Sequence, residues 1–116
     1  MSTIDERVAA GIALLDERTP GWRKKVDLDM LNLADGRWCI VGQVYGEFWE
    51  NQHRPFKNQR RMGLDDDRAA REKLEAKLEA HGFFISWRRQ PYGWQKYAGL
   101  TKAWKRAIRK RDKAQT

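Results

Sequence analysis

The chain has 116 residues, 41% of them hydrophobic, a length that allows one domain with a modest core and excludes two. Its single cysteine, Cys39, excludes an internal disulfide and a cysteine-rich zinc site, and it fits a reducing, cytosolic compartment. The formal net charge is +8, and residues 83–116 hold ten Lys or Arg against one Asp. This concentration of charge suits polyanions or acidic protein surfaces as partners.

The amino-terminal segment predicts a helix over 4–18, because apolar residues recur there at spacings of three and four. Thr3 and Glu6 fit a capping box at its start, and Pro20-Gly21 breaks it at its end. We expect Trp22 to fold back onto this helix. The same segment carries charges every few residues, so it predicts neither a signal peptide nor a membrane span.

The most apolar run of the chain, residues 38–49, follows a turn-rich connector over 26–33. Period two would make this run a hairpin strand but leaves gaps at the glycines, whereas period 3.6 gives one continuous stripe. We therefore expect a buried helix over 38–50. Gly42 and Gly46 would share one edge of it, where another backbone can approach closely.

Residues 51–63 are polar, basic and aperiodic, which predicts an exposed loop. Acidic residues at 65–67 favour the start of a third helix, because they complement its dipole. That helix should end near His81, with Gly82 in the left-handed terminating position. Its apolar stripe is thin, so it should be the most peripheral helix.

The carboxyl-terminal segment predicts an amphipathic helix over 94–112 and a frayed tail over 112–116. One face is apolar and consists of Tyr97, Leu100, Trp104, Ala107 and Ile108. The opposite face is cationic and consists of Lys102, Lys105, Arg106, Arg109, Lys110 and Lys113. The whole sequence therefore predicts a single all-α domain of about four helices. Its core should be dominated by Trp22, Trp38, Trp49 and Trp104.

Several short motifs resemble a known family. They are ALLDE at 13–17, PGW at 20–22, CIVGQVYG at 39–46, GF at 82–83 and YAGLTKAW at 97–104. Together they are similar to a family of small uncharacterised proteins of actinobacteria and their bacteriophages, over most of the chain except residues 50–81. The resemblance implies a bacterial cytoplasmic setting and a phage accessory role, and it brings no catalytic residues.

No arrangement of side chains predicts catalysis. His53 and His81 are far apart and lack the spacing of paired zinc ligands. The Asp residues at 65–67 lack the spaced oxygen ligands of a calcium loop. Cys39 lies in an apolar run and is expected to be a buried, inert thiol. We therefore expect no enzymatic activity, no metal and no cofactor.

The binding candidates are cations and aromatic residues. On the last helix they are Lys102, Lys105, Arg106, Arg109, Lys110 and Lys113; elsewhere they are Trp87, Arg88, Arg89, Trp94, Arg60 and Arg61. The helical cations suit phosphate contacts, although an exposed face that serves solubility fits equally well. Aromatic residues among cations at 87–97 could stack on unpaired bases, but packing around a turn is the commoner role.

The leading hypothesis from these patterns is a non-enzymatic protein that binds nucleic acid through its last helix with little base specificity. The alternative is a phage-type modulator that binds an acidic surface of a bacterial host protein. A third reading is a self-associating structural protein with Gly42 and Gly46 at the contact. No membrane partner is expected.

Overall fold

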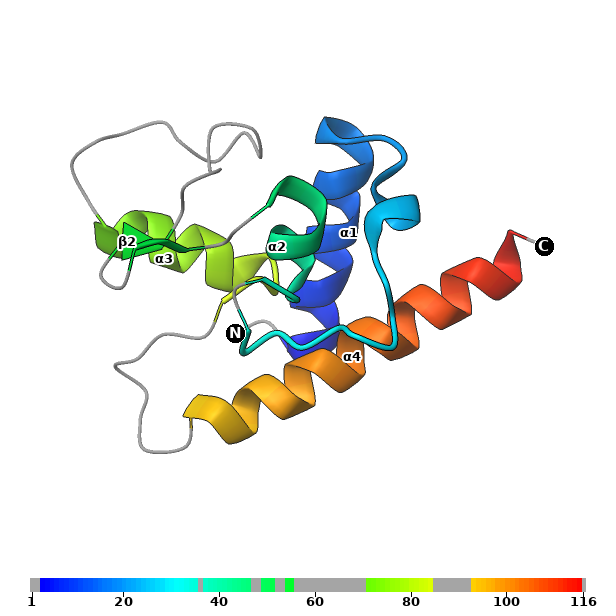
Figure 1. Cartoon of the computed structure of the whole chain (residues 1–116). Coiled ribbons are helices and arrows are strands. Elements are labelled where there is room, and N and C mark those ends of the chain that lie inside the picture. Colours follow the sequence, from blue (N-terminus) through cyan, green and yellow to red (C-terminus); the bar gives the residue numbers. More distant parts are fainter. Residues whose placement is uncertain are drawn as a thin grey trace.

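Helices carry most of the fold in the computed structural model, which describes residues 3–35, 37–46, 49–51, 54–55, 71–84 and 93–115 (Figure 1). The first of them, α1 (Ile4–Arg18), has the predicted bounds. The Glu6 N–H donates to the Thr3 hydroxyl at 3.1 Å, and the Thr3 N–H donates to the Glu6 carboxylate at 3.1 Å. This capping box is confirmed, and it satisfies N–H groups that a helix start otherwise leaves unpaired.

The chain turns back after α1 and packs against it. Gly21 has φ +86°, a left-handed conformation that favours glycine, and the 3-10 helix η1 (Trp22–Lys25) follows it. Trp22 is buried, and its indole N–H donates to the Asp16 carboxylate at 2.9 Å. The predicted return of Trp22 onto α1 is therefore confirmed. Residues 26–33 form the predicted connector of turns.

Helix α2 (Ile40–Tyr45) is much shorter than the helix predicted over 38–50. Cys39 is its N-cap residue, and its Sγ accepts a hydrogen bond from the Gly42 N–H at 3.2 Å. Gly46 ends the helix at φ +102°, a conformation that residues with a Cβ avoid. Because Gly46 lies beyond the helix, the predicted edge that it would share with Gly42 does not exist.

Two short antiparallel strands follow, β1 (Trp49–Asn51) and β2 (Arg54–Pro55). They replace the end of the predicted helix and the start of the exposed loop predicted over 51–63. The apolar run is therefore a helix first and a strand afterwards, with Gly46 between the two. Residues 56–63 of the predicted loop lie outside the described residues.

Helix α3 (Arg71–Ala80) packs against α1. Leu78 and Glu79 are both buried, and the Glu79 carboxylate lies 3.6 Å from the Arg7 guanidinium on α1. Gly82 has φ +72° and supplies the predicted left-handed end of the helix. The predicted start of this helix at 65 lies outside the described residues.

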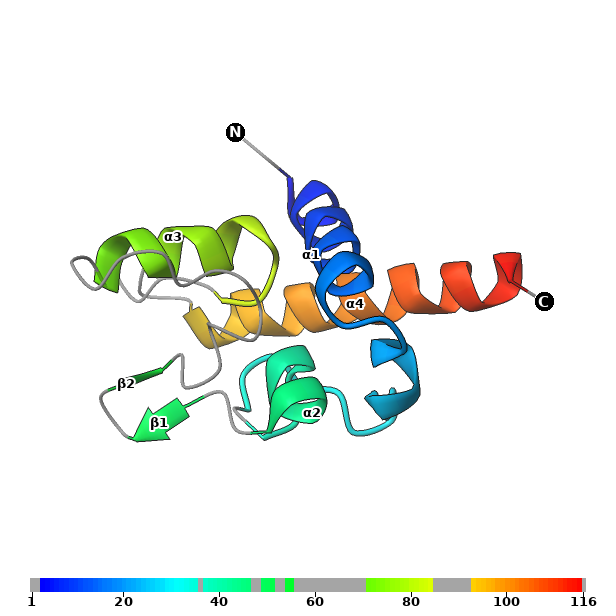
Figure 2. The ribbon, with the colours of Figure 1, turned by 90° about the horizontal axis from the view of Figure 1, so that it is seen from above.

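Helix α4 (Gly93–Ala114) is the longest helix of the described part and crosses α1 (Figure 1). In Figure 2, α1 and α3 lie on one side of α4, and α2 and η1 lie on the other. Its last turns extend beyond the rest of the chain in both views. The prediction of a frayed tail over 112–116 is wrong as far as Ala114, because α4 continues to that residue and Asp112 is held by an ion pair.

Trp104 lies at the centre of the core, where α4 crosses α1. Its indole N–H donates to the Gly82 carbonyl oxygen at 2.7 Å, and its ring stacks on Phe83 with centroids 5.7 Å apart. The Trp22 ring meets it edge-on at 6.4 Å. A Cβ added at Gly11 on α1 would lie 2.9 Å from the same indole, so the crossing leaves no room for a side chain there.

The fold is all-α, as predicted, with the small β1–β2 hairpin as an addition. Trp22 and Trp104 are fully buried in the core, whereas Trp38 is 37% exposed, so the prediction of a core role for Trp38 is wrong. Cys39 and Ile40 take the buried positions at the start of α2 and leave the preceding residue at the surface. Trp49 is placed only by its backbone, in β1.

Candidate interaction surface

The outer side of α4 carries a row of cations. Leu100, Trp104 and Ile108 are buried, and at 100° per residue the cations fall on the other side of the helix. We call this row the cationic stripe; it consists of Lys102, Lys105, Arg106, Arg109, Lys110 and Lys113. All six are exposed except Lys105, which is half-buried. Helix α4 therefore lies with its apolar edge on the body and its cations outward, as its period predicts.

One cation of the stripe is paired with a nearby acid. Arg106 Nη2 lies 2.8 Å from Asp5 Oδ1 at the start of α1, with side chains 66% and 73% exposed. Lys113 also has an interaction within the molecule. Two of the six cations therefore have partners within the molecule. The remaining cations, Lys102, Lys105, Arg109 and Lys110, have no ion pair or side-chain hydrogen bond within the part of the chain that the structure describes.

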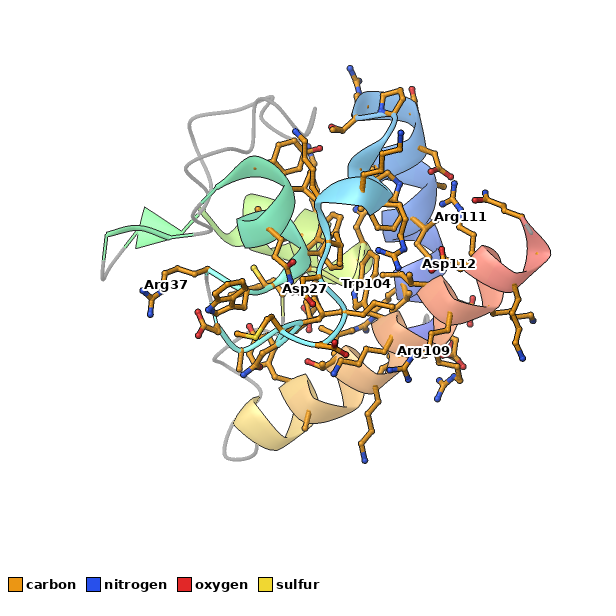
Figure 3. All side chains as sticks on the ribbon, turned by 45° about the vertical axis from the view of Figure 1, so that its right-hand side comes forward. Asp27, Arg37, Trp104, Arg109, Arg111 and Asp112 are labelled. Atoms are coloured by element: carbon orange, nitrogen blue, oxygen red, sulfur yellow. The ribbon has the colours of Figure 1, made fainter. Side chains whose placement is uncertain are left out.

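The carboxyl-terminal end of α4 is held to the body by a group that we call the clamp. Its members are Asp16, Trp22, Arg23, Arg111 and Asp112. Arg23 donates from Nε and Nη2 to both oxygens of Asp112, with distances of 2.8 and 3.1 Å. Arg111 donates to Asp16 at 2.7 Å, and its guanidinium lies 5.6 Å from the centroid of the Trp22 ring. Figure 3 shows Arg111 and Asp112 on the side of α4 toward α1 and η1, and Arg109 apart from them.

Both carboxylates of the clamp favour the ionised form. The pKa of Asp112 is lowered mainly by the hydrogen bonds from Arg23 and by the nearby guanidinium charges. Burial acts to raise the pKa of Asp16, but the hydrogen bonds from Arg111 and Trp22 outweigh it, and that pKa is also lowered. The bidentate, charge-assisted Arg23–Asp112 pair fixes geometry as well as contributing energy. The clamp therefore fixes the end of the helix that carries the stripe.

The side chains of the other candidate binding residues lie outside the described part of the structure. Trp94 is placed only by its backbone, in the first turn of α4. The remaining candidates lie outside the described residues; they are Trp87, Arg88, Arg89, Arg60 and Arg61. The surface that can be described is thus the cationic stripe with its neighbours from α1 and the connector.

Sequence patterns did not predict the surface roles of three residues. Asp5 is 101 positions from Arg106, a separation at which no pairing signal exists in one sequence. Arg37 and Trp38 lie next to the N-cap of α2, and both are exposed. The apolar character of Trp38 pointed to the core, and only the packing of α2 shows otherwise.

The other groups with reactive side chains, Cys39 and His81, have environments that fit structural roles. Burial raises the pKa of the Cys39 thiol to about 12, so the thiol is protonated and inert at neutral pH, as predicted. His81 lies at the end of α3, where its Nδ1 and the Lys77 carbonyl oxygen are 2.7 Å apart. The described residues include no cluster of three His, Cys, Asp or Glu able to hold a metal. Among them, no helix is both long enough and apolar enough to span a bilayer.

No family model, curated protein or solved structure matches this chain. The charge and geometry of its own side chains therefore carry the functional assignment. They offer a rigid helix whose outer side presents cations at fixed spacing.

Proposed function

We propose that this chain is a small, non-enzymatic accessory protein that binds nucleic acid through the cationic stripe of α4. The observation that carries the proposal is the set of four cations that no described acid neutralises, on a helix fixed at its centre by Trp104 and at its end by the clamp. The family resemblance supports a phage-type role in the cytoplasm of a bacterial host cell.

The stripe matches a polyanion in length and in charge. From Lys102 to Lys113 it spans roughly 16 Å at about 1.5 Å per residue, enough to reach several successive phosphates of one strand. Lys and Arg contacts to phosphates carry no base information, and each releases bound counterions. Binding should therefore be nearly independent of base sequence and strongly dependent on salt.

Charge reversal on the stripe tests this proposal. The variant K102E/R109E/K110E changes three exposed cations that have no partner among the described residues. Arg106 is left intact, because a Glu there would repel Asp5 and disturb α1. The matched control R18E/K24E/K25E changes the net charge equally at exposed residues of α1 and η1.

Fluorescence anisotropy with labelled DNA and RNA oligonucleotides gives the readout, and circular dichroism confirms that each variant is folded. We expect the stripe variant to lose at least tenfold in affinity and the control to lose about twofold or less. Equal losses in the two variants would mean that net charge, and not the stripe, governs binding, and would overturn the proposal.

An acidic surface of a bacterial host protein is the second candidate partner. The Arg106–Asp5 pair favours this second candidate, because a cation of the stripe already donates to a carboxylate at 2.8 Å. Pull-downs from bacterial lysate with and without nuclease separate the two candidates. A partner that is retained after nuclease treatment and lost with K102E/R109E/K110E would favour the host protein.

A further inference from the structure

Met30 and Trp38 are large apolar side chains that the core does not use. They are 45% and 37% exposed, and neither belongs to the buried cluster or to the partly buried side chains packed against it. The Asn32 N–H donates to the Trp38 carbonyl oxygen at 3.1 Å, so the chain around Met30 runs beside Trp38. We call these two exposed side chains the apolar patch; the Asn32–Trp38 bond links the stretches of chain that carry them.

The chain beside this patch is hydrogen-bonded to α4 near the start of the cationic stripe. The Leu33 N–H, one residue beyond Asn32, donates to the Thr101 hydroxyl on α4 at 2.9 Å. Thr101 immediately precedes Lys102 and lies one helical turn before Lys105, a rise of about 6 Å. The connector, which carries Met30, is thus hydrogen-bonded to α4 where the stripe begins.

A further cation, Arg37, directly precedes Trp38 in the chain. Arg37 is exposed, and its guanidinium has no hydrogen bond or ion pair within the described residues. Figure 3 shows its side chain projecting outward from the loop. The carboxylate of Asp35 in the same loop accepts a hydrogen bond from the Arg37 backbone N–H at 2.9 Å. The positive charge of Arg37 balances the negative charge of Asp35. The exposed Trp38 side chain thus has a cation directly before it in the chain, and its backbone is linked through Asn32 and Leu33 to the helix that carries the cationic stripe.

We infer that the nucleic acid bound by this protein is single-stranded, with an unpaired base stacked on Trp38. The inference rests on the proposed function, because the stripe and Arg37 supply the phosphate contacts. Unpaired bases expose a π-face that an indole can cover, whereas the bases of a duplex are stacked on one another. Cations beside an exposed aromatic ring are the usual arrangement of sites that bind single strands without base preference.

The test measures the affinity for a single-stranded oligonucleotide and for a duplex of the same length and sequence. The variants are Trp38→Ala, the conservative Trp38→Phe, and Ile4→Ala as a matched control. Ile4 is 42% exposed and lies at the start of α1, outside residues 26–38. Its truncation therefore removes a similar exposed apolar side chain away from the connector. Thermal melting by circular dichroism confirms that all variants are folded.

We expect the wild type to prefer the single strand and Trp38→Ala to lose that preference by about tenfold, a typical effect of removing a stacking aromatic residue. Trp38→Phe should retain part of it, and Ile4→Ala all of it. An unchanged preference in Trp38→Ala, or no preference in the wild type, would overturn the inference. The proposed function would still stand if K102E/R109E/K110E lowered the affinity for both the single strand and the duplex. Absence of all nucleic-acid binding would overturn both.

Discussion

The indole N–H of Trp104 donates to the backbone carbonyl oxygen of Gly82 at 2.7 Å inside the buried core. The bond joins α4 to the turn that ends α3, where Gly82 has φ +72°. It helps to set the rotation of α4 about its own axis. Since the cations lie opposite Trp104, the same bond helps to decide which residues of α4 face outward.

Trp104→Phe should destabilise the fold by about 2–4 kcal/mol. It leaves the buried Gly82 carbonyl without its indole partner, and the smaller ring leaves a cavity. Urea denaturation followed by circular dichroism measures the free energy of unfolding. Trp38→Phe is the control, because its ring is partly exposed and should cost about 0.5 kcal/mol or less. Equal losses in the two variants would contradict the central place of Trp104.

Gly11→Ala should be destabilising and Gly99→Ala stabilising, although both residues lie within helices. A Cβ at Gly11 would lie 2.2 Å from the His81 carbonyl oxygen and 2.9 Å from the Trp104 ring, so the backbones must move apart at a cost of about 1–3 kcal/mol or more. A Cβ at Gly99 meets nothing within 4 Å, and alanine favours the helix by about 0.5–1 kcal/mol. Thermal melting of both variants checks the opposite signs; a shift of the same sign in both would refute the crossing geometry.

Asp112→Asn should weaken the clamp at neutral pH and reduce the loss of stability in acid. Because the folded pKa of Asp112 is lowered, its contribution is present above the ordinary value of 3.8. That contribution is lost as the pH falls through the lowered folded value. Both side chains of the pair are about one-third exposed or more, so the effect at pH 7 should be about 1 kcal/mol or less.

Urea titrations at pH 7 and near pH 3 measure this effect. The difference in the free energy of unfolding between wild type and Asp112→Asn should shrink at the lower pH. Asp29→Asn is the control, since Asp29 has no ion pair among the described residues. A difference that stays constant with pH would show that the Arg23–Asp112 pair does not act as described.

Asp5→Asn should tighten nucleic-acid binding. It frees Arg106 from its partner and removes a negative charge beside the stripe, at little cost in stability because the pair is exposed. We expect about two- to fivefold higher affinity at low salt, consistent with about one more phosphate contact. Glu17→Gln, an exposed change of equal charge on the same helix, is the control. An affinity gain as large in Glu17→Gln would point to net charge alone.

Signals within a few residues of each other predicted the ends of α1 and the two faces of α4. Thr3, Glu6 and Pro20 act within a few residues of α1, and they placed both of its ends. The apolar period of α4 likewise placed Trp104 in the core and the cations outside, because its 22 residues span several turns. In both cases the determining contacts repeat along the element itself.

Two of the wrong predictions concern features that depend on distant contacts. The exposure of Trp38 follows from how α2 packs, and the helical tail of α4 follows from an ion pair between residues 23 and 112. The early end of α2 depends on the conformation of Gly46, which a glycine can adopt but does not require. A single sequence contains no signal for such choices.

The salt dependence of binding tests the central claim most directly. The logarithm of the association constant should fall linearly with the logarithm of salt concentration for the wild type. The slope should be shallower by roughly 2–3 for K102E/R109E/K110E, because three phosphate contacts are removed. The slope of R18E/K24E/K25E should match that of the wild type. Equal affinity at low and high salt, or one slope for all three proteins, would contradict binding through the outer side of α4.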